Sequence, residues 1–169
     1  AWAEELRVDD LLDEFYPAYF GEAAGDMRSI YEELEEHMLL QYVGPYEPGA
    51  AAMYPIKMLD DLLARVAVAK QKVSDPTILA RVQRDGNGLK GTWLWAKFWA
   101  AFGKLNHTRS EADRQRAAEA GQSYLDFVKS LDGTLTLSGK YRRTTERTLK
   151  QLAGPGSYFT EAGKFHYWD

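Results

Sequence analysis

The histidines and cysteines that could do acid–base or metal chemistry in this chain are few. There are three histidines, His37, His107 and His166, and no cysteine. A di-iron site in a helical bundle needs two Glu-x-x-His motifs, and a zinc protease needs His-Glu-x-x-His. Neither pattern occurs, so we expect no metal and no cofactor. Without cysteine, disulfides, thiolate ligands and a thiol nucleophile are excluded as well.

Glycine and carboxylate patterns do not indicate a catalytic site. The sequence GNGLKG, residues 86–91, lies between helical segments and lacks Gly-Lys-Ser/Thr, so we interpret it as a break or bend in a helix rather than a phosphate loop. Asp9, Asp10, Asp13 and Glu14 could supply two carboxylates for glycoside hydrolysis, but an exposed acidic helix face explains them better. We therefore assign no catalytic residue.

An aromatic stretch, GTWLWAKFWAAF at residues 91–102, could stack a sugar or fill a core. On a helical wheel most of its large side chains fall in one arc of about 140°, which favours a core position. These core residues are Trp95, Phe98, Trp99 and Phe102. Trp93 lies on the opposite side and is the best candidate for ligand stacking. The other candidate ligand-binding residues are Tyr46, Tyr54, His166 and Trp168.

Helical spacing of apolar residues recurs along nearly the whole chain. The pattern predicts an all-α fold, an antiparallel bundle of about five or six helices with an aromatic C-terminal tail. We expect a single helical domain over residues 1–169. Its parts are an acidic helical pair at 1–43, a loop rich in Pro and Gly at 44–55, a helical bundle at 56–153 and a tail at 154–169.

The spacing also predicts which side chains point inward from the first two helices. In the first helix, Pro17 should kink or end the helix and Gly21 should stop it. Its inward residues are Leu11, Phe15 and Tyr19. The inward residues of the second helix are Met27, Ile30, Tyr31, Leu34 and Met38.

Four further helices follow from the same spacing and from capping patterns. The third has Leu59, Leu63, Val66 and Val73 inward. SDP at 74–76 supplies an N-cap and an early proline for the fourth, which runs to about residue 106 unless residues 86–88 break it. SEAD at 110–113 resembles a capping box for the fifth, with Ala117, Gly121, Tyr124, Leu125 and Val128 inward. The sixth covers 138–153, with Tyr141, Thr145, Leu149 and Leu152 inward.

Charge is divided unevenly along the chain. Residues 1–61 carry 15 acidic and 3 basic side chains, and residues 62–169 carry 10 acidic and 18 basic ones. Opposite charge favours packing of the two halves on each other, although solvated helix faces explain the pattern more simply. The acidic half would repel phosphate, so we expect no nucleic-acid partner. No apolar run approaches the roughly 18 residues of a membrane span, so we expect no membrane partner.

The first helical pair carries a family resemblance. Trp2, Val8 to Asp10, Leu11 to Phe15, Tyr19 to Gly21, Ala23 with Ala24, and Met27 follow a pattern of Trp, Asp-Val-Asp, Leu-Leu-Asp-Glu-Phe, Tyr-Tyr-Gly, Ala-Ala and Met. This resembles the segment after the catalytic barrel in uncharacterised glycoside-hydrolase-like proteins related to α-glucuronidases. The similarity covers residues 2–38, and RVQRDGNGLKGTWLWAKF resembles a later helix of the same region.

The resemblance implies a secreted or periplasmic, carbohydrate-directed parent protein, possessing a TIM-type barrel that would hold the catalytic acids. Such a barrel takes at least about 200 residues, more than this chain has. We therefore expect a C-terminal fragment or module: a non-catalytic accessory domain that supports the barrel or contributes to glycan binding. The alternative is a stand-alone interaction or scaffold protein that uses its oppositely charged halves. A third hypothesis is an enzyme site built from the 44–55 loop and the tail, with His166 as its acid–base group.

Overall fold

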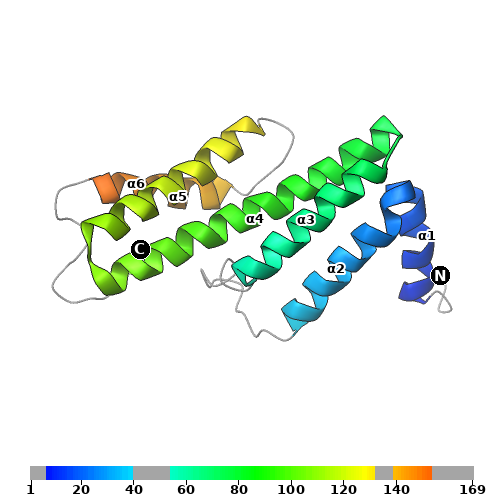
Figure 1. The fold of residues 1–169 in the computed structure, drawn as a ribbon, viewed down its shortest axis with the longest axis horizontal. Helices are drawn as coiled ribbons and strands as arrows, with labels where there is room; N and C mark the ends of the chain where they lie inside the picture. Colours follow the sequence, from blue (N-terminus) through cyan, green and yellow to red (C-terminus); the bar gives the residue numbers. More distant parts are fainter. Residues whose placement is uncertain (1–6, 40–53, 132–138, 154–169) are drawn as a thin grey trace, which may run out of the picture. The chain divides into compact units, whose positions relative to one another are not determined.

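The computed structural model describes residues 7–39, 54–131 and 139–153, and nearly all of these residues are helical, with no strand among them. Six α-helices and one 3₁₀ turn follow each other along the chain (Figure 1). They are α1 (Val8–Phe20), η1 (Gly21–Ala23), α2 (Ala24–Leu39), α3 (Ile56–Lys72), α4 (Pro76–Thr108), α5 (Glu111–Ser130) and α6 (Gly139–Ala153). The predicted all-α helical bundle is confirmed. The predicted tail and residues 44–53 of the predicted loop lie outside the described residues.

The chain divides into two compact units, residues 1–96 and 97–169. Helix α4 contributes residues 76–96 to the first unit and 97–108 to the second. Each unit has its own apolar core cluster. None of the described helices combines the length and the apolar character that a membrane-spanning segment requires.

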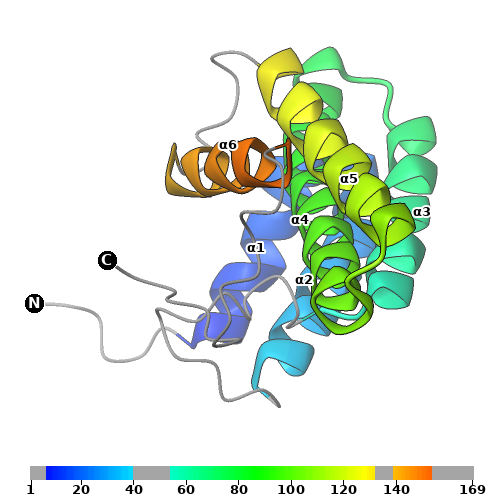
Figure 2. The same cartoon turned by 90° about the vertical axis from the view of Figure 1, so that its left-hand side faces the viewer.

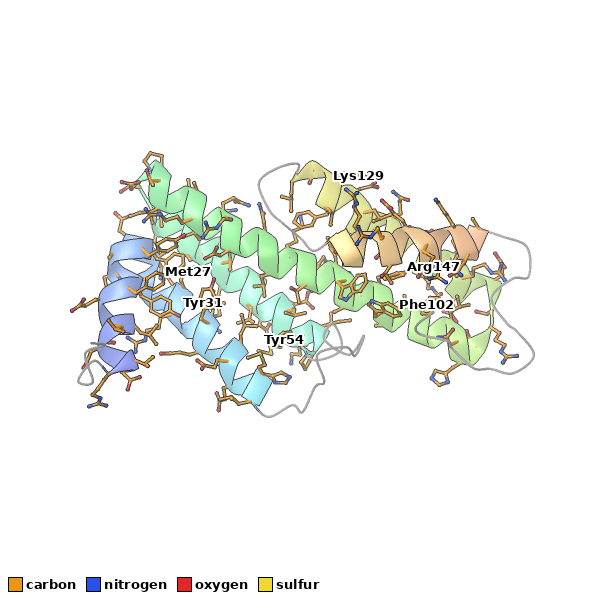
Figure 3. The ribbon with its side chains drawn as sticks, turned by 180° about the vertical axis from the view of Figure 1, so that it is seen from behind. Met27, Tyr31, Tyr54, Phe102, Lys129 and Arg147 are labelled. Carbon is orange, nitrogen blue, oxygen red and sulfur yellow. The ribbon has the colours of Figure 1, made fainter. Side chains whose placement is uncertain are left out.

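The first unit packs α1, α2 and α3 with the N-terminal part of α4. Figure 1 shows α2 and α3 side by side, with α4 along the other side of α3. Met27 and Tyr31, labelled in Figure 3, both come from α2, but Met27 is fully buried whereas Tyr31 is 40 % exposed. The largest fully buried side chains of this unit are Phe20, Met27, Leu59, Leu62 and Val82.

The predicted inward face of α1 is wrong for two of its three residues, whereas Tyr19 packs against the core as predicted. Leu11 and Phe15 are each 47 % exposed, and the buried side chains of this helix are Tyr16 and Phe20. Leu12 packs against the core one position after the predicted Leu11. The sequence contains two apolar rows with the same spacing, and the row beginning at Leu12 is the one that meets the other helices.

Pro17 does not end α1, which continues to Phe20. Proline in the last turn removes one backbone donor, but the residues after it still form their own helical bonds. The predicted stop at Gly21 is confirmed: its φ is +51°, and its N–H donates to the Pro17 carbonyl oxygen. A Cβ at this position would also lie 2.6 Å from Ile78 Cδ1, so glycine meets both a conformational and a steric requirement.

Helices α2 and α3 confirm only part of their predicted faces. On α2, Met27 and Ile30 are buried as predicted. Met38 is 48 % exposed, and Tyr31 is exposed as well. On α3, Leu59 and Val66 are buried as predicted, and so are two residues that the prediction left out, Leu62 and Ala69. The apolar face of α3 is wider than predicted because α2, η1 and α4 all pack around it.

Helix α4 begins as predicted but is not broken at residues 86–88. Asp75 Oδ1 accepts hydrogen bonds from the backbone N–H groups of Thr77 at 2.6 Å and Ile78 at 3.1 Å, and Pro76 is the first helical residue. A Cβ at Gly86 would lie 2.6 Å from Val66 Cγ1, so the glycine lets α3 approach closely. That packing offsets the roughly 1 kcal/mol that glycine costs inside a helix. Of the two alternatives that the sequence left open, the unbroken helix is the one observed.

The core of the second unit confirms the prediction for the aromatic stretch. Phe98 and Phe102 are fully buried, Trp99 packs against Phe102, and Trp95, the last aromatic residue of the first unit, is 8 % exposed. On α5, Ala117, Gly121, Tyr124 and Leu125 are buried as predicted, and Val128 is half-buried. Figure 2 shows α6 running across α5 rather than alongside it. Thr145 and Leu152 are the predicted residues that α6 buries.

Candidate functional site

An apolar row on the outward face of α1 is the most distinctive surface of the first unit. Val8 is 69 % exposed, and Leu11 and Phe15 are each 47 % exposed. These residues are spaced by three and four positions, which places them on one face of the helix. Asp10 and Glu14, both exposed, lie beside the row on the side away from the core. The surface therefore combines apolar side chains with an acidic border.

Phe15, the last residue of this row, belongs to a stack of planar groups. The rings of Phe15 and Tyr19 stack with centroids 5.0 Å apart and an interplanar angle of 17°. On Tyr19, the guanidinium of Arg81 lies 4.5 Å from the ring centroid, and Arg81 Nη1 also donates to the Tyr19 carbonyl oxygen at 3.0 Å. Arg84 donates to the Tyr19 hydroxyl. Phe15 is thus exposed but fixed in orientation, which lowers the entropy lost on binding.

Beside this stack, a cluster of polar side chains joins α2 to α4. The Tyr31 hydroxyl donates to Asp85 Oδ2 at 3.0 Å, and Arg84 Nε donates to Asp85 Oδ1 at 3.2 Å. Burial, followed by the nearby Asp85 carboxylate, raises the pKa of Tyr31 above its ordinary value. The phenol therefore stays protonated at neutral pH and acts as a hydrogen-bond donor, which makes it unsuitable as a general base.

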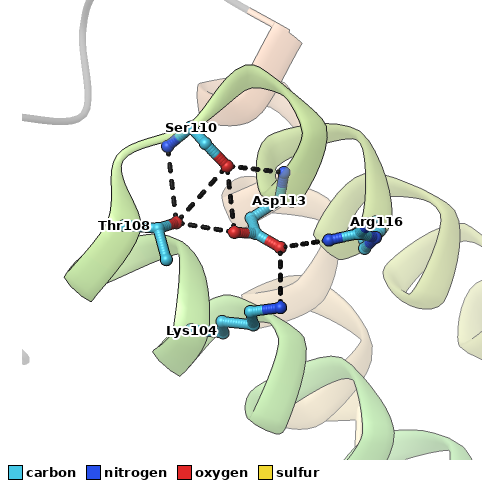
Figure 4. Close-up of polar contacts among 5 residues, drawn as sticks. All are labelled: Lys104, Thr108, Ser110, Asp113 and Arg116. Carbon is cyan, nitrogen blue, oxygen red and sulfur yellow. Dashed lines mark hydrogen bonds and ion pairs between the residues drawn. The ribbon is translucent and has the colours of Figure 1, made fainter.

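The most buried charged group of the second unit is Asp113, at the corner between α4 and α5 (Figure 4). Its Oδ2 accepts from the hydroxyls of Thr108 at 2.7 Å and Ser110 at 2.9 Å. Its Oδ1 accepts from Arg116 at 2.7 Å and lies 3.4 Å from Lys104 Nζ. Ser110 Oγ in turn accepts from the Asp113 N–H, which confirms half of the predicted capping box. In the other half, Thr108 Oγ1 rather than Asp113 accepts from the Ser110 N–H.

This cluster is an anchor for the corner rather than a catalytic acid. The hydroxyl donors Thr108 and Ser110, followed by the Arg116 guanidinium, hold the pKa of the Asp113 carboxyl well below its usual range. The carboxylate therefore carries no exchangeable proton near neutral pH. Its contacts with Thr108 and Lys104 tie the end of α4 to the start of α5, and those with Ser110 and Arg116 fix the first turn of α5.

We predict that Asp113→Asn destabilises the second unit in a pH-dependent way. Because the folded pKa is lowered, the stabilisation is fully present above the unfolded pKa of about 4 and is lost as the pH falls from there toward the folded pKa. At pH 7 the variant should melt roughly 3–8 °C below the wild type, and the gap should shrink at about pH 3. Circular dichroism during heating measures both values.

Asp126→Asn is the matched control, since it changes the same chemical group on the same helix. Asp126 is exposed and accepts one hydrogen bond, from Gln122 at 2.7 Å. Its replacement should leave the melting temperature nearly unchanged at both pH values. Equal losses in the two variants would contradict an anchoring role for Asp113.

The five candidate ligand-binding residues fall into two groups. Tyr46, His166 and Trp168 lie outside the described residues. Tyr54 is half-buried against the core of the first unit, with its ring 5.8 Å from that of His37, and burial raises its pKa. Trp93 also packs against this core, and its indole N–H donates to Asp60 Oδ1 at 2.7 Å. Binding of a ligand by Trp93 or Tyr54 stays a prediction.

Comparisons with known protein families, curated proteins and solved structures find no match to this chain.

The resemblance to the glycoside-hydrolase-like proteins therefore stays a prediction, and the site rests on geometry alone. Among the described residues, no group of three or more His, Asp or Glu side chains is arranged to hold a metal ion. Sequence reasoning missed the α1 surface because it assigned Leu11 and Phe15 to the core. Val8 was the available signal, because it extends the Leu11 row by one turn beside Asp10 and Glu14.

Proposed function

We propose that this chain is a non-catalytic helical module that binds another protein domain through the outward face of α1. The observation that carries the proposal is the exposed row of Val8, Leu11 and Phe15 on a helix whose opposite face is already buried. Exposing apolar area in one continuous row costs free energy unless a partner covers it. The stacked Phe15 supplies the rigid aromatic anchor that interfaces favour.

The acidic border indicates the chemistry of the partner. Asp10 and Glu14 make no ion pair with any other described residue, so they are available to lysine or arginine side chains around an apolar contact. The resemblance names a candidate for this partner, the catalytic barrel of a carbohydrate-directed parent protein. Under this proposal the chain supports that barrel, and Trp93 and Tyr54 are candidates for a contribution to glycan binding.

Leu11→Ser tests the proposal because Leu11 lies in the exposed row. We expect the free energy of unfolding to change by no more than about 0.5 kcal/mol, while binding to the partner is lost. Denaturation in urea measures the stability. A photo-reactive amino acid at position 11, introduced in cells that make the natural protein, captures the partner.

Two controls make the test specific. Leu12→Ser alters the neighbouring residue that packs against the core, so it should lower stability as well as binding. A photo-reactive group at Val68, 49 % exposed on α3, should give no discrete adduct. Equal capture from positions 11 and 68, or none from position 11, would remove the α1 surface from the proposal. Turnover of chromogenic glycosides or glucuronides by the chain alone would contradict the non-catalytic assignment.

A stand-alone scaffold protein is the second candidate function, favoured by charge. Residues 1–96 carry 17 acidic and 9 basic side chains, and residues 97–169 carry 8 acidic and 12 basic ones. Two copies could therefore attract each other through unlike units. Sedimentation at low and high salt distinguishes this candidate, since charge-driven association weakens as salt screens it. A monomer at both salt concentrations would count against self-association.

A further inference from the structure

Helix α6 carries a row of three exposed cations. Arg143, Arg147 and Lys150 are spaced by four and three residues, which places them on one face. Arg147 is labelled on α6 in Figure 3. Thr145 and Leu152, which are buried, lie on the opposite face. The three charges therefore point away from the residues that attach α6 to its unit.

Four other cations of the second unit are paired with acids. Lys104 and Arg116 contact Asp113, and Arg114 lies 3.3 Å from Glu111. On α6 itself, Arg142 lies 3.6 Å from Glu146. Within the described part of the chain, the cations of the row form no such ion pair. The row, which we call the α6 cation row, is thus a local excess of positive charge.

The three cations of the row repel one another. Like charges four or three residues apart on a helix destabilise it by a few tenths of a kcal/mol per pair. The buried side of α6 is only weakly apolar, since two of its three fully or nearly buried side chains are Thr145 and Thr148. A bound anion would remove the repulsion.

We propose that the α6 cation row binds an acidic helical segment of a partner protein. A row that spans seven positions is about 10 Å long, and glutamates with the same spacing on a facing helix would match it. The exposed side chains described on α6 include no aromatic ring, so the base stacking used by single-stranded nucleic acid is absent there. This surface is separate from α1 and does not depend on its proposed function.

Binding of a labelled synthetic peptide to the full chain tests the proposal. The probe is an alanine-based helical peptide with glutamates at positions i, i+4 and i+7, and its control has glutamines there. Fluorescence anisotropy should detect binding of the glutamate peptide only. Each single Gln substitution in the row should weaken binding about 2–3-fold, and the triple variant R143Q/R147Q/K150Q about 10-fold. Raising NaCl from about 0.05 to 0.5 M should weaken it further.

A control variant and a measurement of helix content accompany the binding experiment. Lys57→Gln removes one charge from an exposed position on α3 and should leave the affinity unchanged. Circular dichroism should show that the triple variant keeps its helix content, because the three side chains are exposed and are replaced by another good helix former. The proposal is overturned if the peptide binds the triple variant as tightly as the wild type, if it does not bind at all, or if a short DNA duplex binds the row in preference to the peptide.

Discussion

Phe20→Ala is expected to lower the free energy of unfolding of the first unit by about 3–5 kcal/mol. The ring is 1 % exposed and belongs to the core cluster. It lies 4.8 Å from the Tyr19 ring in an edge-on arrangement and 6.0 Å from that of Tyr16 in a stacked one. Removing it leaves a cavity that these neighbours cannot fill without leaving their own positions. Urea denaturation followed by circular dichroism measures the loss.

Phe15→Ala on the same helix is the control for this prediction. The Phe15 ring is 47 % exposed, and the substitution mainly removes its stacking on Tyr19, so we expect a cost of no more than about 1.5 kcal/mol. The same substitution should strongly weaken binding to the α1 partner. If both variants lost equal stability, α1 would bury the face predicted from sequence instead of the one in the structure.

The face of α1 shows what the sequence could not decide. Leu11, Phe15 and Tyr19 have the same spacing as Leu12, Tyr16 and Phe20, so helical periodicity favours neither row. The choice depends on contacts with distant segments. Tyr31 of α2 faces both Tyr16, at 6.2 Å, and Phe20, at 6.4 Å between ring centroids. Such packing depends on contacts between the assembled helices, so the periodicity of a single sequence does not predict it.

The glycines of α4 illustrate the same limit. Local propensity argues for a break at Gly86 and Gly88, because glycine has a high entropic cost in a helix. The fit of Val66 against Gly86 reverses that preference. Helix boundaries that depend only on neighbouring residues were predicted correctly, as the Asp75 cap and the Gly21 stop both show. The fold class, the helix starts and the aromatic core of α4 could be predicted for this reason.

The candidate sites were harder to predict than the helices. Stacking of Arg81 on Tyr19 joins residues that are 62 positions apart in the sequence, and no local pattern indicates it. The anchoring of Asp113 was partly visible, because the capping box placed it near Ser110, but its contact with Lys104 depends on the turn between two helices. The charges of α6 were visible in the sequence, whereas their exposure in one row was not.

Helix α5 is closely packed at Gly121. A Cβ at this position would lie 2.9 Å from Leu149 Cδ2 and 2.9 Å from Phe98 Cε2. Leu149 belongs to α6 and Phe98 to α4, so the missing side chain lets two helices approach α5 at once. Phe98 is fully buried, and its ring therefore has no free space into which to move. The predicted inward position of Gly121 is confirmed.

Gly121→Val should therefore lower the free energy of unfolding by at least about 2 kcal/mol, because its branched side chain must displace Leu149 and Phe98. Gly103→Ala is the matched control. Gly103 lies inside α4 in the same unit, and a Cβ there would meet no atom within 4 Å, so alanine should stabilise the protein by about 0.5–1 kcal/mol through helix propensity alone. In urea denaturation, we expect Gly121→Val to lower the free energy of unfolding and Gly103→Ala to raise it. A neutral Gly121→Val would mean that α6 does not pack on this face of α5 in solution, and the α6 cation row would then need a different helix arrangement.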